Sequence, residues 1–595
     1  AQHILDTISQ KGLFVQALDE QRTWYRLHHF FRDFLQSKLK LTQADIYKQM
    51  HSKAAEWFKQ HGFLMEAIYH VQQIEDEQLL LSLLNDVSRE LIIKGRKYTL
   101  LELVKPLPEA ILVKNPKLLY DVIWSLLLTH QSTLAHHYLQ LWHSVDQHET
   151  LLKHEDQLGL APLIALLEDK LALAYDLAQQ NLEQLTCTAY FARAPLVGIS
   201  VLYHICLGEV KAARKLILQT RIIYIQHHSV YGLAIADCFD ALCDYLLGNL
   251  NIAAEKFDQI GLRAEYKKLG LDETNRVAIN NICSSFKADL YYEMNQMPQT
   301  EAALSDFKGG EYFAVPDMVV VGYILQLRLA TLQQDQRAVQ ACLNQVQVRS
   351  SQWSLSRVSE TIHTYVHEGK GTSLDLKNIE QTTTKPFLNV THLLRGDDLI
   401  SVRTQIFTGH MQQAKQYLIQ QLPFFRDYPL RQARIKLLLA LAFYKLQQND
   451  QAFDYLQQAL ENLMPTQAVR VVLDEHPLIW EMLNQFSKIL ALTHQSNVVE
   501  LIKYIQYLFT LVTPQDMRER EYVQTDSFCD KEILSSREIQ IIEKLGMGLT
   551  DLEVADLLFL SVNTVKWHLR NIYNKLKVRS RLEAIIAAKK KGYIS

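Results

Sequence analysis

Glycine, proline and long apolar runs are scarce in this chain of 595 residues. It has 20 glycines and 13 prolines, and the windows between them are long, periodic and rich in Leu, Ala, Gln and Glu, which form helices readily. Hydrophobic residues make up 48% and charged residues 21%, which is ordinary for a globular protein and argues against extensive disorder. We therefore predict an all-α chain with either several cores or one long repeat array.

Paired cysteines and membrane signals are also missing. The seven cysteines are odd in number and never occur in a C-x-x-C spacing, which predicts a reduced, cytoplasmic compartment. The best candidate for a membrane span, residues 118–128, is interrupted by Asp121 and is shorter than the roughly 18 apolar residues required. Residues 1–40 lack the basic start and apolar core of a secretory signal. No membrane partner is expected. The start at Ala1 rather than Met suggests a fragment or a processed product.

Motifs for catalysis, metals and nucleotides are absent as well. No Gly-flanked serine and no H-E-x-x-H occurs, and no carboxylate pair has a context that suggests acid–base work. The adjacent His28 and His29 have no cysteine or carboxylate cluster at ligand spacing. The nearest approach to a phosphate loop, at Gly369-Lys370, has Thr364 where the first glycine is needed. We expect neither an enzyme nor a metal or cofactor in this chain.

The charge of the chain is unevenly distributed. From residue 561 to the end there are nine Lys or Arg and one acid, Glu583, so this tail carries about +8 while the whole chain carries −3. A basic tail on an otherwise acidic protein is typical of a nucleic-acid partner, although a solvated helix end would have the same composition.

Four helix starts follow one another in the last sixty or so residues. Three of them are Ser/Thr-x-x-Glu capping boxes, which satisfy the unpaired amides at a helix start, at Ser535–Glu538, Thr550–Glu553 and Ser580–Glu583. Ser561 is the fourth start, without the glutamate. The short connections between them predict a four-helix unit that contains a helix-turn-helix.

The third of these helices has an apolar stripe at spacings of three and four, formed by Val565, Leu569, Ile572 and Leu576. We expect this stripe to pack inward as part of the structural core. The opposite face carries Lys566, Trp567 and Arg570, whose side chains are long enough to reach base edges in a major groove. Trp567 could equally pack on a neighbouring helix.

The whole module resembles the LuxR family of DNA-binding domains. The residues that carry the resemblance are Leu534-Ser535-Ser536-Arg537-Glu538, Gly548-Leu549-Thr550, Leu558-Phe559-Leu560-Ser561, Thr564-Val565-Lys566, His568-Leu569, Asn571-Ile572-Tyr573 and Lys575-Leu576. The resemblance implies base contacts from Lys566, Trp567 and Arg570, backbone contacts from Thr564, Asn571, Lys575, Ser580 and Arg581, and a structural role for Glu538. The stretch Asp551-Leu552-Glu553 departs from the family, many of whose members have a basic residue there.

The long middle shows a loose helical repeat from about residue 185 to 464. Each instance is a helix, a short turn and a second helix with an alanine a few residues on. The turns lie at Leu207-Gly208, Leu247-Gly248, Met294-Asn295, Gln333-Gln334, Gly409 and Gln447-Gln448. Neighbouring turns are about forty residues apart, longer than a standard tetratricopeptide repeat, so we predict a TPR-like α-solenoid. Its concave surface could bind an effector, which the sequence leaves unknown, or the repeats could only space two domains.

The N-terminal residues resemble large MalT-like regulators. The run Tyr25-Arg26-Leu27-His28-His29-Phe30-Phe31 is similar to the end of that family's winged-helix region, and residues 54–108 are similar to its helical arm. We therefore divide the chain into the end of a winged helix (1–50), a helical arm (51–180), a TPR-like superhelical sensor (181–510), a linker (511–530) and the LuxR-type module (531–595). The resemblance implies ATP only for a longer parent with an upstream ATPase domain.

The sequence as a whole predicts a DNA-binding transcriptional regulator, on family grounds an activator. The implied partners are double-stranded promoter DNA, RNA polymerase, a small-molecule or protein effector on the repeats, and a second copy in an effector-dependent homo-oligomer. The alternative is a TPR-like interaction scaffold with an incidental basic tail. A signalling ATPase is a further alternative only if an upstream domain exists.

Overall fold

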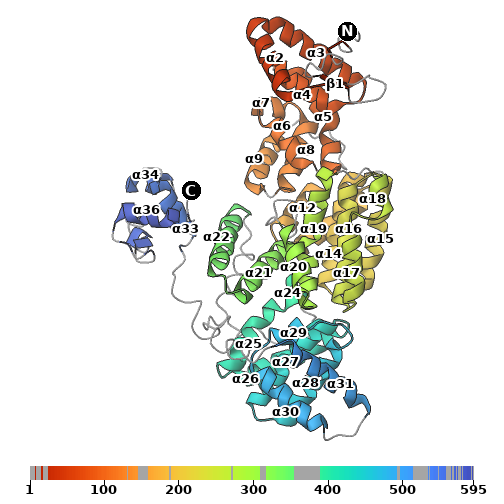
Figure 1. Ribbon diagram of the computed structural model, residues 1–595, viewed down its shortest axis with the longest axis vertical. Coiled ribbons are helices and arrows are strands. Elements are labelled where there is room, and N and C mark those ends of the chain that lie inside the picture. The colour runs from red at the N-terminus through yellow and green to blue at the C-terminus, as the bar shows by residue number, and fades with distance from the viewer. Residues whose placement is uncertain are drawn as a thin grey trace. The chain divides into compact units, whose positions relative to one another are not determined.

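The computed structural model consists almost entirely of helices (Figure 1). It describes residues 7–8, 15–17, 25–74, 76–94, 96–129, 131–144, 158–186, 189–269, 273–307, 316–353, 389–491, 496–512, 534, 536–546, 549–557, 565, 568–570, 572–573, 576, 578, 580–590 and 593. The only strands in these residues are two short ones near the N-terminus. The prediction of an all-α chain is confirmed.

The chain folds into two compact units, Ala1–Ile92 with Thr99–Val122, and Ile93–Tyr98 with Ile123–Ser595. Strands β1 (Val15–Ala17) and β2 (Tyr25–Leu27) pair antiparallel with Gln16 opposite Arg26. The helices up to residue 143 are α2 (His29–Thr42), α3 (Ala44–Gln60), α4 (Leu64–Ile74), α5 (Glu77–Ile93), α6 (Lys97–Val104), α7 (Glu109–Val113), α8 (Pro116–Leu127) and α9 (Ser132–His143).

Asp121, which interrupts the apolar run of α8, lies in the core of the first unit. Its side chain is fully buried, accepts a hydrogen bond from Ser88 Oγ at 2.6 Å, and pairs with Arg89 Nε at 2.7 Å. Burial raises the pKa of Asp121, while Arg89 and Ser88 act to lower it. The polar residue in the apolar run therefore belongs to an internal network. No helix in the described part of the chain is long and apolar enough to cross a membrane.

Pairs of helices joined by tight turns make up the middle of the chain (Figure 1). These helices are α12 (Leu160–Leu167), α13 (Leu171–Gln184), α14 (Tyr190–Cys206), α15 (Val210–Gln226), α16 (Val230–Leu246), α17 (Leu250–Gln259), α18 (Ala264–Lys268), α19 (Glu273–Glu293), α20 (Met297–Ser305), α21 (Pro316–Leu332) and α22 (Gln336–Trp353). After residue 389 follow α24 (Val390–Arg395), η2 (Asp397–Leu399), α25 (Ile400–Phe407), α26 (Met411–Gln421), η3 (Leu422–Phe425), α27 (Pro429–Lys445), α28 (Asn449–Leu463), α29 (Arg470–Leu473), α30 (Leu478–Ala491) and α31 (Ser496–Thr510).

Each of the six predicted repeat turns contains one residue in the left-handed backbone region. The residues and their φ angles are Gly208 (72°), Gly248 (81°), Asn295 (59°), Gln334 (56°), Gly409 (102°) and Gln447 (60°). At the first turn the amide of Gly208 donates to Ile205 and that of Glu209 donates to His204, the pattern that closes a helix C-terminus and reverses the chain. The turns identified in the sequence thus end the first helix of each pair.

Small residues lie where the second helix of a pair meets the first. Ala213, Ala303, Ala414 and Ala452 are buried, as the repeat pattern predicts. In the two other repeats the predicted alanines, Ala254 and Ala338, are not buried, and the neighbouring Ala253 and Val339 are buried instead. A small side chain lets the two helix backbones approach closely, so the pairs stack into a continuous core.

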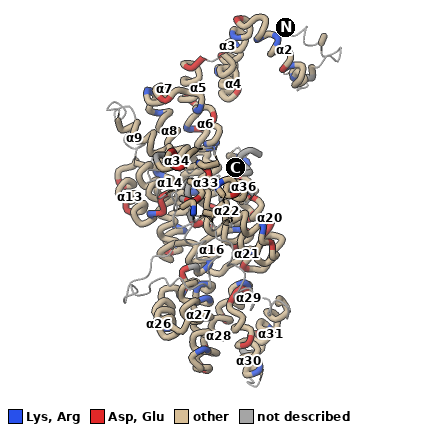
Figure 2. Tube along the Cα trace, turned by 90° about the vertical axis from the view of Figure 1, so that its left-hand side faces the viewer, with Lys and Arg blue, Asp and Glu red and all other residues tan. Residues whose placement is uncertain are grey.

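The helices before residue 353 and those after residue 389 meet through charged side chains, a contact that we call the charged junction. Glu293 on α19 accepts from Arg434 on α27 at 2.6 Å, and Asp289, one turn earlier, pairs with Arg395 on α24. Tyr292 donates to Asp474 at 2.7 Å. Figure 2 shows that acidic and basic residues are interspersed along the described chain.

Most of the following tyrosines, which lie on the first helices of the helix pairs, belong to the continuous core of the stacked pairs. Tyr245, Tyr291 and Tyr292 are buried, and Tyr245 donates to Asp289 at 2.8 Å. Tyr203 and Tyr231 are half-buried. Three of these five tyrosines are therefore core residues of the repeats.

All the free cysteines among the described residues lie on repeat helices that end at or before residue 353. Cys206, Cys238, Cys243, Cys283 and Cys342 are buried on helices α14, α16, α19 and α22. Burial raises the pKa of Cys243, Cys283 and Cys342 to about 12 and raises that of Cys238. A thiol in this state is a packing residue rather than a nucleophile.

His476 lies between α29 and α30, and its shifted pKa is expected to make the stability of the repeats after residue 389 depend on pH. Burial lowers the pKa of His476 from 6.5 to about 4; nearby Glu475 opposes this shift, whereas Arg403 and Lys445 add to it. The ring stacks on Phe407 with centroids 3.8 Å apart, and Nδ1 accepts from the backbone of Leu478 at 3.2 Å. The folded chain therefore binds fewer protons than the unfolded chain between these two pKa values.

We expect the contribution of His476 to the free energy of unfolding to fall as the pH drops from about 6.5 to about 4, by at most about 1.4 kcal/mol per pH unit. Urea unfolding of the wild type and of His476→Gln across this range measures it, because the variant lacks the titrating group. Parallel pH profiles of the two proteins would show that His476 has no such role.

Candidate nucleic-acid interface

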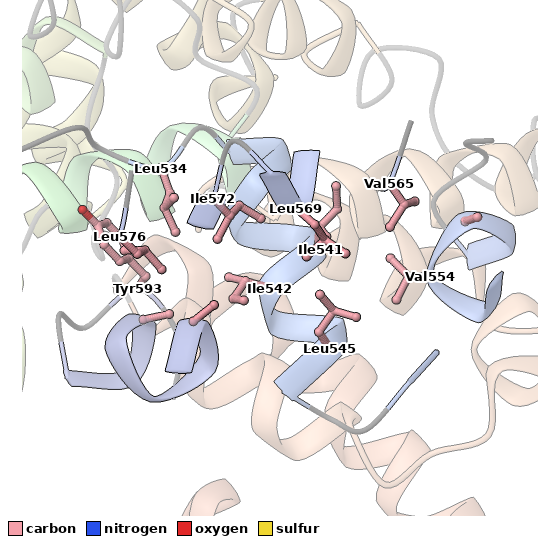
Figure 3. Close-up of a cluster of buried hydrophobic side chains, with 13 residues drawn as sticks. Leu534, Ile541, Ile542, Leu545, Val554, Val565, Leu569, Ile572, Leu576 and Tyr593 are labelled. Carbon is pink, nitrogen blue, oxygen red and sulfur yellow. The ribbon is translucent and has the colours of Figure 1, made fainter. Parts of the chain in front are cut away.

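The C-terminal residues form a small helical module with its own core. Its helices are α33 (Ser536–Gly546), α34 (Asp551–Leu557) and α36 (Arg581–Lys590), together with a third segment that is described at residues 565, 568–570, 572–573 and 576. The buried core cluster consists of Leu534, Ile541, Ile542, Leu545, Val554, Ala555, Val565, Leu569, Ile572, Leu576, Ala584, Ala588 and Tyr593. Figure 3 shows these side chains converging from all four segments.

The third segment contributes its predicted apolar stripe to this core. Val565 and Ile572 are fully buried, and Leu569 and Leu576 are each 6% exposed. They pack with Ile541 and Leu545 of α33 and Val554 of α34. These four residues therefore form the inner face of the segment.

Arg570 is the predicted base-contacting residue whose placement the structure describes. It is exposed, and it directly follows the buried Leu569. A guanidinium carries the forked donors that pair with a guanine edge, and the base contact of Arg570 stays a prediction. Two other predicted base contacts, Lys566 and Trp567, and three predicted backbone contacts, Thr564, Asn571 and Lys575, lie outside the described residues.

Glu538, predicted to have a structural role, lies on α33 and is 3% exposed. Its helix also supplies the fully buried Ile541 and Ile542. A carboxylate buried to this extent is badly placed to meet the phosphate backbone. Its predicted capping partner, Ser535, lies outside the described residues.

The capping box at the start of α34 is formed in full. Glu553 accepts hydrogen bonds from the amide of Thr550 at 2.7 Å and from its hydroxyl at 2.8 Å, while the Glu553 amide donates to Thr550 Oγ1 at 3.3 Å. The bond from the Thr550 amide lowers the pKa of Glu553, and the bond from the hydroxyl adds to this shift. This helix start therefore keeps an ionised carboxylate at its tip.

At the start of α36 the other predicted backbone contacts also make bonds within the protein. Ser580 Oγ accepts from the amide of Glu583 at 3.3 Å, which is half of the predicted capping box. Arg581 donates to the backbone oxygen of Leu549 and lies 3.3 Å from Asp551 Oδ1. The sequence marks Asp551 as unusual for the family but gives no sign that it pairs with Arg581, because the two lie thirty residues apart and follow no helical spacing.

Three segments of the chain match known families. Residues 1–47 match the MalT winged helix domain, residues 162–489 match the MalT-like TPR region, and residues 532–588 match the bacterial regulatory proteins of the luxR family. The second match alone covers more than half of the chain. The order of the three matches is the order predicted from the sequence.

Curated relatives match along almost the whole chain at low identity. The HTH-type transcriptional regulator MalT of Vibrio parahaemolyticus is 22% identical over 619 residues, covering 98% of this chain and 66% of the relative. The regulator of the same name from Yersinia pestis is 22% identical over 625 residues, covering 99% of this chain and 67% of the relative. This chain thus spans about two thirds of the length of these relatives.

Proposed function

The chain belongs to the MalT-like family of regulators, and from this premise we propose that it is a transcriptional regulator that binds promoter DNA through residues 531–595. The observation that carries the proposal is the third segment of the C-terminal module. Its apolar stripe is buried in a four-segment core while Arg570 is exposed beside it, which is the arrangement of a recognition helix. The proposed role requires no catalysis by this chain.

Selection of bound sequences from random duplex DNA tests this function directly. The full chain is compared at one near-physiological salt concentration with a chain truncated after Asp530. We expect an enriched motif with the full chain and none with the truncated chain. Salt-sensitive binding without any enriched motif would contradict sequence-specific regulation, because phosphate contacts alone do not depend on sequence.

Two substitutions separate base recognition from backbone contact. Arg570→Ala is expected to cost about 1–3 kcal/mol on the selected sequence and to relax the preference at one position of the site. Lys575→Ala, at a predicted backbone contact, is expected to weaken selected and scrambled duplexes alike. Titration of both variants against both duplexes measures the difference. Equal losses on both duplexes for Arg570→Ala would remove this residue from base recognition.

We further propose that the repeat region senses an effector, either a small molecule or a protein, and that effector binding promotes homo-oligomerisation. One helix-turn-helix binds DNA weakly and mostly through phosphates, so several copies on repeated sites would supply the affinity. Activation through RNA polymerase in the cytoplasm completes this proposal. No nucleotide step is included, because the sequence contains no phosphate-binding loop.

An interaction scaffold is the alternative function. Stacked helix pairs are a common protein-binding surface, and in that case the basic tail would be incidental. The scaffold predicts that deleting residues 535–595 leaves partner binding unchanged and that the chain has no sequence preference on DNA. The DNA selection described above therefore distinguishes the two functions.

A further inference from the structure

The salt bridge between Asp551 and Arg581 links the start of α34 to the start of α36. Arg581 Nη1 lies 3.3 Å from Asp551 Oδ1, and Arg581 Nη2 donates to the backbone oxygen of Leu549. Both terminal nitrogens of the guanidinium thus face the protein. The side chains are 39% and 29% exposed, so solvent reaches both of them.

The pair lies beside the segment that carries Arg570. Tyr573, three residues after Arg570, packs against the core cluster. Burial raises the pKa of Tyr573, and the charges of Asp551 and Arg581 also affect it, with opposite signs. Leu549, whose backbone oxygen accepts from Arg581, packs against the same core cluster as Tyr573, so the pair lies close to the proposed recognition segment.

We propose that Asp551 is a positioning residue that holds the Arg581 guanidinium on the protein and so withholds one cation from the DNA backbone. The inference rests on the proposed function. A guanidinium beside a recognition segment ordinarily donates to phosphate oxygens in the same forked geometry that it uses toward a carboxylate. Here Asp551 holds one arm of that fork and the backbone oxygen of Leu549 holds the other, and DNA must compete with both.

Because the Asp551–Arg581 salt bridge is weak, its competition with the DNA backbone can be measured. An exposed salt bridge contributes little to stability, because water and salt screen it. Removing Asp551 should therefore leave the fold intact, and Arg581 is then held only by the neutral backbone oxygen of Leu549, which competes with a phosphate less well than a carboxylate does. The released side chain can then neutralise one phosphate, and each neutralised phosphate steepens the dependence of log K on log salt by about 0.9.

The test is a double-mutant cycle on DNA affinity in the full chain. Asp551→Ala, Arg581→Ala and the double variant are titrated by fluorescence anisotropy against the selected and a scrambled duplex over a range of salt concentrations. We expect Asp551→Ala to tighten binding about threefold to tenfold on both duplexes and to steepen the salt dependence by about 0.9. Arg581→Ala alone should change affinity less than about twofold, whereas in the double variant it should abolish the gain.

Glu583→Gln is the matched control, because it removes an exposed acid two residues from Arg581 with the same change of charge. The changes in DNA affinity caused by Glu583→Gln and by Arg581→Ala should add up in the double variant. The two residues act on DNA only through their separate long-range charges, so neither substitution should alter the effect of the other. Asp551→Asn repeats the main test with a side chain of nearly the same shape, and circular dichroism checks that each variant is folded.

The outcomes distinguish a failure of this inference from a failure of the proposed function on which it rests. If Arg581→Ala weakens the wild type as much as it weakens Asp551→Ala, or if Asp551→Ala and Asp551→Asn leave both affinity and salt dependence unchanged, Asp551 does not withhold Arg581. If neither the wild type nor any variant binds DNA, the proposed function itself is wrong.

Discussion

Arg434→Met is expected to destabilise the repeat region by about 3–5 kcal/mol. Arg434 is paired with Glu293 at 2.6 Å in the charged junction, where the glutamate side chain is fully buried and that of the arginine is 11% exposed. Removing the arginine leaves a carboxylate in the interior without its counter-ion, and this is more costly than the loss of the pair itself. The effect should extend across the junction, because Glu293 and Arg434 are 141 residues apart in the sequence.

Hydrogen exchange of the full chain, followed by peptide mass spectrometry, measures this loss locally. Protection should fall in peptides from both α19 and α27. Arg426→Met, the same substitution at an exposed position, should change protection by less than about 0.5 kcal/mol. A second variant, Glu293→Leu with Arg434→Met, removes both charges and should recover most of the loss. If the double variant is as unstable as the single one, the buried charge is not the cause.

Ile572→Ala is expected to unfold the C-terminal module and to abolish sequence-specific DNA binding. Ile572 is fully buried in the core that all four segments share, and truncating such a side chain costs about 2–5 kcal/mol. A module of this size has a total stability of only several kcal/mol. Specific affinity should therefore fall at least about tenfold, with loss of exchange protection in α33 and α36.

The control for this variant lies in the same module. Ile586 on α36 is 58% exposed, so Ile586→Ala removes the same atoms without opening a cavity and should leave both DNA affinity and exchange protection close to those of the wild type. Protection in α14 to α17 should be unchanged in both variants. Equal behaviour of Ile572→Ala and Ile586→Ala would mean that the core shown in Figure 3 does not hold the module together.

Local signals in the sequence were sufficient to predict the repeat turns and the buried stripe of the third segment. A turn such as Leu247-Gly248 interrupts a periodic pattern, and its glycine adopts the left-handed conformation that ends a helix. Val565 and Ile572 recur at helical spacing and are buried together. In both cases the physical cause acts within a few residues of the chain, so one sequence carries the signal.

The charged junction and the Asp551–Arg581 pair could not be predicted in this way. Glu293 and Arg434 belong to helices in different repeats, and a charged residue in an amphipathic helix ordinarily indicates a solvent-facing side. Only the stacking of the helices brings the two into contact. The family resemblance places Arg581 against DNA, whereas the geometry places it against Asp551, because the pairing depends on a chain-specific acid.

The distribution of cysteines in the repeats supplies a built-in chemical reporter. All the free thiols of the described residues lie buried on helices that end at or before residue 353, and burial raises the pKa of four of them, Cys238, Cys243, Cys283 and Cys342. An alkylating reagent reaches these buried thiols only when the helices around them open, so its incorporation at these five cysteines, resolved by peptide mass spectrometry, reports on the opening of the repeats before residue 353. Pulses of reagent applied to the unlabelled chain would reveal whether an effector that binds elsewhere tightens or loosens these helices.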